Sequence, residues 1–342
     1  MGHSEINLLQ YLRSKTQVDL DTFDDTVSKE FGKCVDCTSN QYEYYTELAK
    51  PNRKAILLKA IDDADKLRDQ FPEVTFEELA VEVGAVSLAL RMLPDISGNL
   101  HVMANPNFSY SKKKIVDTGK RLHKLFRIAD PSFDGSRLVM KVPATWEGLQ
   151  ACRELRNLGI KTLGTTLFSM EQAVLAGEAG CVSISPFVRE LRELVDSSFI
   201  DPNPQLDLSI QAQKWYKAVG LPTRVKACAT RGLDEILMLA GVDAQTLVPD
   251  DLRGLQSTTR SMAQVAAMSL FKSMADTDTS MAKVSYPSYI DNEERYRMDF
   301  GYADEGNAQR KLGQAIHIFC GFQAKAEEVV RNARANANAN AN

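Results

Sequence analysis

Short apolar runs alternate with longer amphipathic stretches along most of this chain. The apolar runs are rich in Val, Ile, Leu and Thr, which favours β-strands, and most are followed by apolar residues at helical spacing. The predicted strands cover residues 16–22, 32–39, 99–106, 137–144, 160–168, 181–188, 223–230 and, more weakly, 245–250. The predicted helices include residues 111–129, 145–159, 169–180, 208–220 and 232–241, several of which end in a glycine.

This alternation predicts an α/β protein whose strands pair in parallel through right-handed crossovers. Eight such units close most naturally into a single (β/α)8 (TIM) barrel. The alternative is an open doubly wound sheet, which usually carries a glycine-rich first turn. The corresponding segment here, "VDLDTFDD", has no glycine.

We therefore expect one barrel domain over residues 1–332. Within it, residues from about 251 to 332 form a C-terminal helical extension, with helices at 257–275 and 305–333. The tail at 333–342 contains the low-complexity run "ANANANAN", which we expect to fray and which adds nothing to the barrel.

The amino-acid composition and the net charge limit the kinds of molecule that this chain is expected to bind. Of the 342 residues, 44% are hydrophobic and 25% are charged, and the net charge is -4. Nucleic-acid binding usually requires a basic face, which this balance does not indicate. The N-terminal sequence lacks the features of a secretory signal, and no stretch is long and apolar enough for a transmembrane helix. We therefore expect a cytoplasmic protein that binds neither nucleic acid nor membrane.

Six cysteines spread over a long chain do not indicate a disulfide framework. Cys34 and Cys37 form a lone CxxC motif. A zinc site would need a second ligand pair, and the four histidines are not spaced to supply one. A redox motif would lie at a helix N-terminus, whereas this segment is predicted as a strand. We expect two packed cysteines and no metal.

Polar residues gather near the C-terminal end of almost every predicted strand, where barrels of this class place their active sites. We expect these side chains to point into one mouth, because layers of Val, Ile and Leu would suffice for packing. They are Asp19, Asp21, Asp36, Thr38, Asn40, Asn105, Asn107, Lys141, Thr165, Thr166, Ser183, Ser185, Lys226, Thr230 and Arg231.

Lys141 is the central residue of this set, since it interrupts the apolar strand "LVMKVP". Burial disfavours the charged form of a lysine, and a neutral amine can attack a carbonyl to form a Schiff base. The protonated imine then accepts electrons while a neighbouring carbon–carbon bond breaks or forms, with a carboxylate of the first strand as acid/base. The alternatives are a lysine that pairs with a buried carboxylate or one that extends to solvent.

Arg231 precedes the predicted helix at 232–241 and offers an anion site together with the helix N–H groups. Ser185, after the sixth strand, could add a hydroxyl. Each feature is weak by itself, because most surface arginines bind nothing specific. Combined with a Schiff-base lysine, they indicate a phosphorylated sugar as substrate.

The segment "MKVPATWEGLQACRELRNLGIKTLGTTLFSMEQAVLAGEAGCVSISPFV" resembles the transaldolase family of class I aldolase barrels, from the Schiff-base lysine through the SPFV segment. The resemblance extends over about residues 16–330. "LDTFD" resembles the family's first-strand DTGD motif, and "DCTSNQ" resembles its TTNPS motif. The last predicted helix resembles the C-terminal helix that covers the transaldolase active site.

The resemblance implies transfer of a dihydroxyacetone unit from sedoheptulose 7-phosphate or fructose 6-phosphate to an aldose phosphate such as erythrose 4-phosphate or glyceraldehyde 3-phosphate, in the pentose phosphate pathway. It implies no metal or organic cofactor and is compatible with a homodimer. By position, the implied catalytic residues are Lys141 (Schiff base), Asp21 (acid/base) and Thr165 (catalytic water). The implied substrate-binding residues are Thr38, Asn40, Ser185 and Arg231 (the last two for phosphate) and Phe187 (pocket shape).

The chain departs from the family pattern in the third strand. Transaldolases carry there a glutamate that helps a water form and dehydrate the carbinolamine, whereas "GNLHVMANPNF" contains no acid. Our alignment places Met103 at this position, with His101 and Asn105 as alternatives. Because one acid/base group typically contributes about 10²–10⁴-fold, its loss predicts slower imine formation.

Three further positions depart from the pattern. Leu163 occupies the position of the family's fifth-strand asparagine, and Gln41 follows "TSN" where the family has proline. Arg189-Glu190 follows "SPFV" where the family has Gly-Arg. Arg189 and Arg192 are the candidates for the displaced arginine. These departures keep two alternatives open: a diverged Schiff-base aldolase of a specialised pathway that acts on another carbonyl compound, and a non-catalytic transaldolase-like binding protein.

Overall fold

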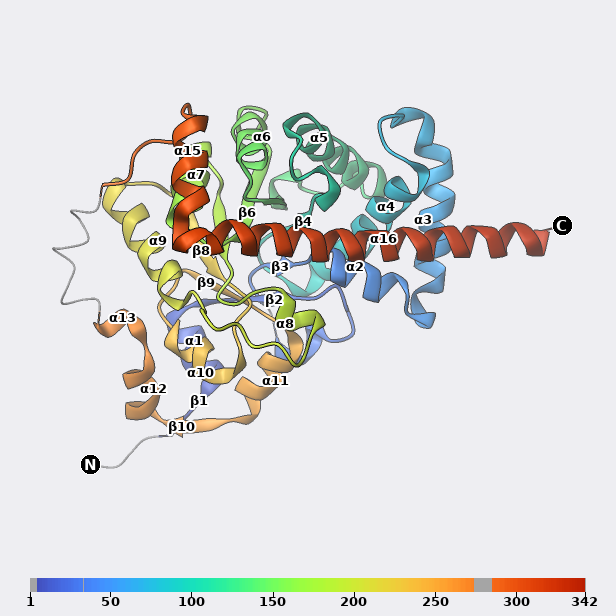
Figure 1. The fold of residues 1–342 in the computed structure, drawn as a ribbon. Coiled ribbons are helices and arrows are strands. Elements are labelled where there is room, and N and C mark those ends of the chain that lie inside the picture. Colours follow the sequence, from blue (N-terminus) through green and yellow to red (C-terminus); the bar gives the residue numbers. More distant parts are fainter. Residues whose placement is uncertain (1–4, 33, 274–284, 342) are drawn as a thin grey trace.

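Eight parallel strands close into a barrel at the centre of the molecule (Figure 1). The computed structural model describes residues 5–32, 34–273 and 285–341. The barrel strands follow one another in sequence order, and β2 pairs with β9 to close the ring. They are β2 (Gln17–Asp21), β3 (Cys37–Thr38), β4 (Leu100–Met103), β5 (Leu138–Pro143), β6 (Lys161–Leu167), β7 (Ser183–Pro186), β8 (Arg224–Ala227) and β9 (Ala244–Leu247). The predicted (β/α)8 barrel is confirmed.

One strand, β3, is much shorter than the sequence predicts. Only Cys37 and Thr38 pair as a strand, and Cys34 makes an isolated bridge to Ile96. Between them the side chain of Asp36 accepts a hydrogen bond from the backbone N–H of Asn99 at 2.6 Å, in place of a ladder bond. Cys34 and Cys37 are both buried, so the prediction of two packed cysteines is confirmed.

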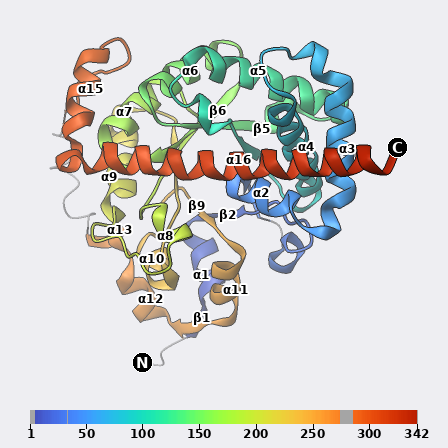
Figure 2. The same ribbon diagram turned by 45° about the vertical axis from the view of Figure 1, so that its right-hand side comes forward.

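Helices surround the barrel and cover its faces (Figure 2). They are α1 (Leu8–Lys15), α2 (Gln41–Leu48), α3 (Lys54–Leu67), α4 (Phe76–Met92), α5 (Lys112–Ala129), α6 (Trp146–Asn157), α7 (Met170–Ala179), α8 (Arg192–Val195), α9 (Leu206–Val219), α10 (Gly232–Met238), α11 (Pro249–Ser257), α12 (Met262–Met268), α13 (Leu270–Ser273), α15 (Glu293–Tyr302) and α16 (Asn307–Ala341).

Local capping explains where the predicted crossover helices begin and end. Ser111, Thr145 and Ser169 cap α5, α6 and α7, each accepting a hydrogen bond from the third backbone N–H of its helix. Gly180 and Gly220 end α7 and α9 in the left-handed conformation, with φ of 79° and 72°, which glycine adopts without a Cβ clash. The five predicted helices between the strands are confirmed within a few residues.

The segment after the barrel corrects one prediction. Instead of a single helix over 257–275, the chain forms β10 (Thr259–Ser261), α12 and α13, and residues 274 and 275 lie outside the described part. Ser261 ends the strand and caps α12 in a capping box with Gln264. The strand β10 pairs antiparallel with β1 (Glu5–Asn7), so the N-terminal segment is tied to this extension outside the barrel. The sequence pattern gave no sign of this pair.

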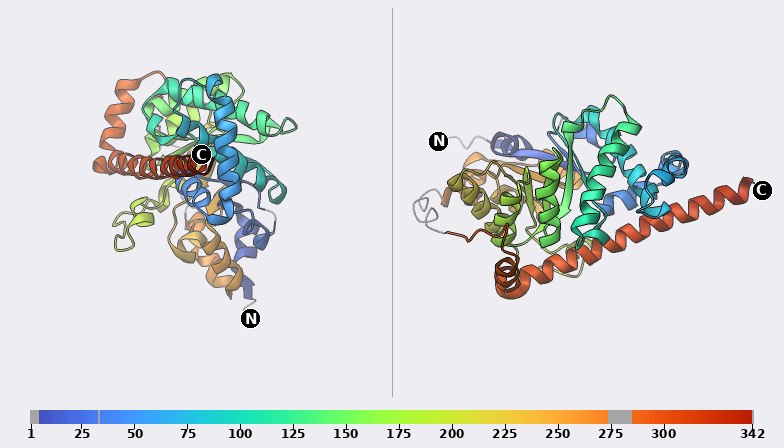
Figure 3. Two further views of the ribbon diagram at one scale, coloured as in Figure 1. Left: turned by 90° about the vertical axis from the view of Figure 1, so that its right-hand side faces the viewer. Right: turned by 90° about the horizontal axis from the view of Figure 1, so that it is seen from above.

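The last helix, α16, crosses the open end of the barrel and extends beyond it (Figures 1 and 3). The prediction placed this helix at 305–333, but it continues through the alanine–asparagine tail to Ala341. The alternating alanines favour a helix here, and the expected fraying of the tail stays a prediction. Tyr42 and Tyr45 of α2 pack their rings against Phe322 of α16 and hold the helix to the barrel.

Candidate active site

A cavity of about 300 Å³ lies at the C-terminal ends of the barrel strands, with Phe319 of α16 in its wall. Barrels of this class carry their active sites at this end. Another hollow of about 420 Å³ lies between α3, α4 and α5 on the outside of the barrel, away from the strand ends, so its size does not make it the better candidate. The predicted site residues that line the cavity at the strand ends are Asp21, Asn40, Lys141, Ser185, Phe187 and Arg231.

Lys141 lies on β5 between two apolar neighbours in register, Met103 of β4 and Leu163 of β6. The residue is only 6% exposed, and its side chain faces the cavity. Among the side chains that the structure describes, no carboxylate forms an ion pair with its amine. Neither alternative considered from sequence, a structural ion pair or an extension into bulk solvent, describes this lysine.

Asp21 ends β2 and reaches the same cavity. Its Oδ1 accepts a hydrogen bond of 2.6 Å from the Thr38 hydroxyl, and Thr38 is buried without lining the cavity. Asn40 caps α2, since its Oδ1 accepts from the backbone N–H of Tyr42 at 2.8 Å. Thr38 therefore fixes the Asp21 carboxylate, and the cap fixes Asn40 in the cavity wall.

The other end of the cavity contains the arginines expected to meet a phosphate. Arg231 is half-exposed, with its guanidinium 3.7 Å from the Glu193 carboxylate. The backbone N–H of Arg231, which precedes α10, donates to the Glu235 carboxylate at 2.7 Å. Arg189 also lines the cavity, but its guanidinium already binds Glu235 at 2.5 Å and Glu193 at 3.0 Å.

Thr165 is predicted to position a water, but it does not line the cavity. It pairs with Pro143 in register and is 1% exposed. The next residue, Thr166, has a φ of 54°, an uncommon value for a β-branched residue, and the register between β6 and β7 shifts here. The backbone is thus irregular beside the cavity, and the role of Thr165 stays a prediction.

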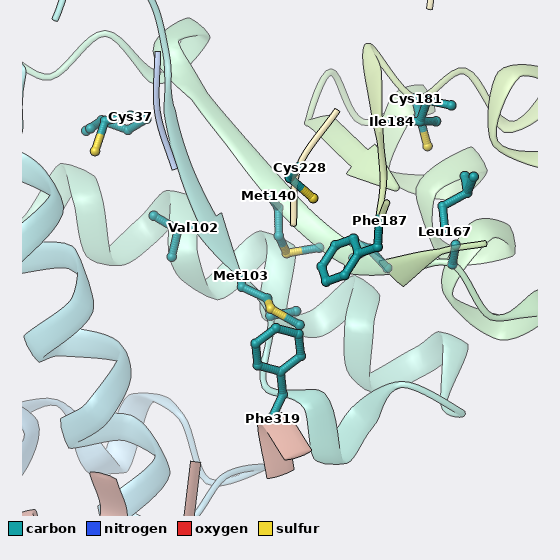
Figure 4. Packing of buried hydrophobic residues seen from close by; sticks show 14 of the residues in the cluster. Cys37, Val102, Met103, Met140, Leu167, Cys181, Ile184, Phe187, Cys228 and Phe319 are labelled. Atoms are coloured by element: carbon teal, nitrogen blue, oxygen red, sulfur yellow. The ribbon is translucent and has the colours of Figure 1, made fainter. Parts of the chain in front are cut away.

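No acid from β4 reaches the cavity. Met103 points toward Phe319 of α16 in an apolar contact (Figure 4). The two alternatives considered from sequence are engaged elsewhere, because His101 lies 3.2 Å from Asp36 and Asn105 donates to Glu78 at 3.1 Å. The strand β4, which is the third barrel strand, therefore presents an apolar surface beside Lys141.

Several polar residues predicted to point into the mouth lie sealed in the barrel interior instead. Lys226 donates to Asp19 at 2.5 Å and to Asp36 at 2.6 Å, and His101 approaches the same Asp36 carboxylate. None of these four side chains lines the cavity. Burial raises the pKa of Asp36, but the hydrogen bond from His101 and the charge of Lys226 outweigh it and lower the pKa overall. The prediction of one shared mouth is wrong for this group.

Glu43, a buried acid on α2 that lines the cavity, was not predicted from the sequence. The helix α2 was not predicted, so this position had no place in the expected site. A signal was available: Asn40 followed three residues later by Glu43 is a typical helix start. Glu43 accordingly occupies the first turn of α2.

Known proteins of one family are similar to this chain over most of its length. The family model described as Transaldolase/Fructose-6-phosphate aldolase matches residues 19–297. The chain belongs to this family. It is 30% identical over 335 residues to a transaldolase of Shewanella pealeana, covering 95% of this chain and 98% of the relative. It is 28% identical over 330 residues to a transaldolase of Shewanella frigidimarina, again covering 95% and 98%. A transaldolase of Buchnera aphidicola is 28% identical over 257 residues, which cover 73% of this chain and 80% of the relative.

Within the described ranges, none of the helices has the length and apolar character needed to cross a bilayer. In the same ranges, no three His, Cys, Asp or Glu side chains are grouped as they would be around a metal ion.

Proposed function

We propose that this chain is a transaldolase-type transferase that acts through a Schiff base on Lys141. The observation that carries the proposal is a buried amine, unpaired within the described residues, that faces a cavity shared with the Asp21 carboxylate. An amine that has no ion-pair partner and faces a cavity can act as the nucleophile toward a carbonyl group. Family membership and relatives named transaldolase support the same reaction class.

The proposed reaction starts when the Lys141 amine attacks the carbonyl carbon of a ketose phosphate, sedoheptulose 7-phosphate or fructose 6-phosphate, and water leaves to give an iminium. Asp21 removes the proton of the hydroxyl beyond the bond to be broken. That bond's electrons pass into the iminium, and an aldose phosphate departs. The remaining enamine then attacks the aldehyde of the acceptor, erythrose 4-phosphate or glyceraldehyde 3-phosphate, and hydrolysis frees the lysine.

The other side chains are proposed to hold the substrate. Asn40 contacts its hydroxyls, Phe187 shapes the wall, and Thr38 acts on the substrate through Asp21, to which it is hydrogen-bonded. Ser185 and Arg231 bind the phosphate, for which Arg231 has a half-exposed guanidinium with only a long contact to Glu193. Thr165 supports the water of the hydrolytic step from behind the wall.

Borohydride trapping tests the proposal. The protein is incubated with fructose 6-phosphate, reduced and digested, and the adduct is located by mass spectrometry. We expect a dihydroxyacetone-sized adduct on Lys141 that is absent from Lys141→Ala. The peptide with Lys226 is an internal control, since that buried lysine is held by two aspartates. No adduct on Lys141 with any ketose phosphate or simple ketone would contradict the proposal and favour a non-catalytic binding role.

A second candidate is a diverged Schiff-base aldolase that acts on another carbonyl compound. One observation favours it: the guanidinium of Arg189 is bound by Glu193 and Glu235, so this end of the cavity has less free positive charge for a phosphate than its arginines suggest. In the trapping experiment, labelling of Lys141 by dihydroxyacetone or another ketone, but not by fructose 6-phosphate, would select this candidate.

A further inference from the structure

A buried carboxyl group with no partner lies in the wall of the Lys141 cavity. Glu43 is 8% exposed as a residue and lines the cavity together with Asp21 and Lys141. Among the described residues, no donor forms a hydrogen bond or an ion pair with its side chain. Its carboxyl oxygens therefore have no protein partner among these residues and open to the cavity, where a substrate can reach them.

The position of Glu43 makes its lack of a partner more informative. A glutamate three residues after a helix cap usually turns back to bind the backbone N–H of the capping residue. Here the Asn40 side chain accepts from Tyr42, and the Glu43 carboxyl lies in the cavity wall instead of closing this box. The helix is in turn held at the barrel mouth, because Tyr42 packs edge-on against Phe322 of α16 at 5.1 Å.

A neighbouring acid on the same helix shows what a structural carboxylate looks like. Glu47 is also buried, one turn after Glu43, but both of its oxygens are satisfied. It accepts from Lys50 at 2.5 Å and from Arg53 at 3.2 Å, and it does not line the cavity. The two glutamates therefore share a helix and a degree of burial but differ in pairing and in access to the cavity.

The environment of Glu43 favours its protonated form. Burial raises its pKa well above the ordinary value of 4.5, and the negative charges of Asp21 and Glu47 add to this. Lys141 and Lys50 act in the opposite direction without outweighing it. From β3, the buried Cys37 also faces this group. From α16 come the rings of Phe319, in the cavity wall, and Phe322, with the Lys325 amine 5.1 Å from the centre of the latter.

We propose that Glu43 is a catalytic acid of imine formation. It performs this task from α2, because β4 carries Met103 and supplies no acid in this chain. The inference rests on the proposed Schiff-base function of Lys141. Glu43 lies on α2, which follows β3 in the sequence and packs against α16. Met103 of β4 lies against Phe319 (Figure 4), whereas Glu43 lines the cavity together with Lys141.

The proposed step is balanced. The neutral Lys141 amine adds to the ketone carbon, and its proton passes to the oxygen to give a carbinolamine. Glu43 donates its carboxyl proton to that hydroxyl, the carbon–oxygen bond breaks, and water leaves. The nitrogen lone pair forms the carbon–nitrogen double bond, so an iminium and a glutamate carboxylate result. On hydrolysis a water adds to the iminium carbon and returns its proton to Glu43.

The test measures imine formation by itself. Dihydroxyacetone is the probe, because it needs no carbon–carbon cleavage, and the rate at which cyanoborohydride traps it on Lys141 is followed against pH. We expect Glu43→Gln, which keeps the shape of a neutral carboxyl, to slow trapping by about 10²–10⁴-fold. We also expect the alkaline decline of the rate to disappear, since that decline reports the loss of the Glu43 proton. The matched control Glu47→Gln should keep the rate and still show the decline, shifted to lower pH because one negative charge that raises the Glu43 pKa is gone.

The outcomes separate this inference from the function on which it rests. Trapping in Glu43→Gln with the rate and pH profile of the unsubstituted protein would overturn the role of Glu43 and leave the Schiff base intact. No trapping in the unsubstituted protein would overturn both. If Glu43→Gln does not fold, Glu43→Asp replaces it: the shorter acid should slow trapping and retain the alkaline decline, and an unchanged rate would overturn the proposal.

Discussion

Two lysines are buried in this barrel, and they differ in every respect except burial. Lys141 on β5 is 6% exposed and Lys226 on β8 is 3% exposed. Lys226 donates to Asp19 and Asp36 and is sealed in the interior, whereas Lys141 has no ion-pair partner among the described residues and faces a cavity. Burial of a charged residue therefore does not by itself identify a reactive group. The combination of burial, absence of a partner and access to a cavity does.

The largest effect should come from the unpaired lysine. Lys141→Met is expected to reduce carbon–carbon transfer by at least about 10⁴-fold, because no other group can form the imine. Its free energy of unfolding should change by less than about 1 kcal/mol, since no partner is left unpaired. Transfer assays and urea denaturation of the same preparation measure both. A variant that loses stability as well as activity would make Lys141 structural.

The paired lysine should show the opposite behaviour. Lys226→Met leaves two buried aspartates, Asp19 and Asp36, without their shared cation. Breaking a buried ion pair by removing one partner costs about 3–5 kcal/mol, and we expect a loss of that size in the free energy of unfolding. Lys141→Met, with the same change of side chain in the same barrel, is the control. Equal stability of the two variants would mean that the paired and the unpaired lysine do not differ in their contribution to the fold.

The barrel was predictable from sequence because its signal is local and repeated. Alternating apolar strands and capped amphipathic helices fixed the eight units, and the run "LVMKVP" located the strand of Lys141. Two features of the fold could not be predicted from the sequence, each for a physical reason. The pair of β1 with β10 joins segments about a whole domain apart, and no local pattern specifies such a partner. The short strand β3 depends on the side chain of Asp36, which replaces a ladder bond.

The candidate site was predictable only in part, since a position at a strand end does not say which way a side chain points or with what it pairs. Lys141, Asp21 and Arg231 line the cavity as expected, but Lys226 and Asp36 neutralise each other below it. Pairing of this kind joins strands far apart in sequence and has no signature in either strand. Glu43 was missed because its helix was not predicted.

The contributions of Asp36 and Glu43 to the free energy of unfolding should change with pH in opposite directions. The lowered pKa of Asp36 stabilises the fold above the ordinary value of 3.8, and that contribution is lost as the pH falls. The raised pKa of Glu43 stabilises the fold below the ordinary value of 4.5, and that contribution is lost as the pH rises toward the folded-state pKa. Glu43→Gln removes only the second contribution.

Urea denaturation of the unsubstituted protein and of Glu43→Gln from about pH 2 to pH 9 separates these two contributions. Above the ordinary pKa of Glu43, the stability of Glu43→Gln relative to the unsubstituted protein should rise by up to about 1.4 kcal/mol per pH unit, then level off. At the acid end the two curves should fall in parallel, because the Asp36 cluster is the same in both. A constant difference over the whole range would mean that Glu43 has the same pKa in the folded and unfolded states, which would contradict the raised pKa.

The smallest effect is expected at Thr38, which the resemblance to transaldolases places on the substrate and the structure places behind Asp21. Its hydroxyl donates to Asp21 at 2.6 Å without lining the cavity. Thr38→Val keeps the shape and removes this hydrogen bond, so the free energy of unfolding should fall by about 1 kcal/mol and kcat by about 10-fold. If Thr38 acts by orienting Asp21, KM should stay unchanged, because the loss is confined to the step in which Asp21 moves a proton. A rise in KM at constant kcat would instead show direct substrate contact, and would mean that the cavity extends past Asp21 when the substrate is bound.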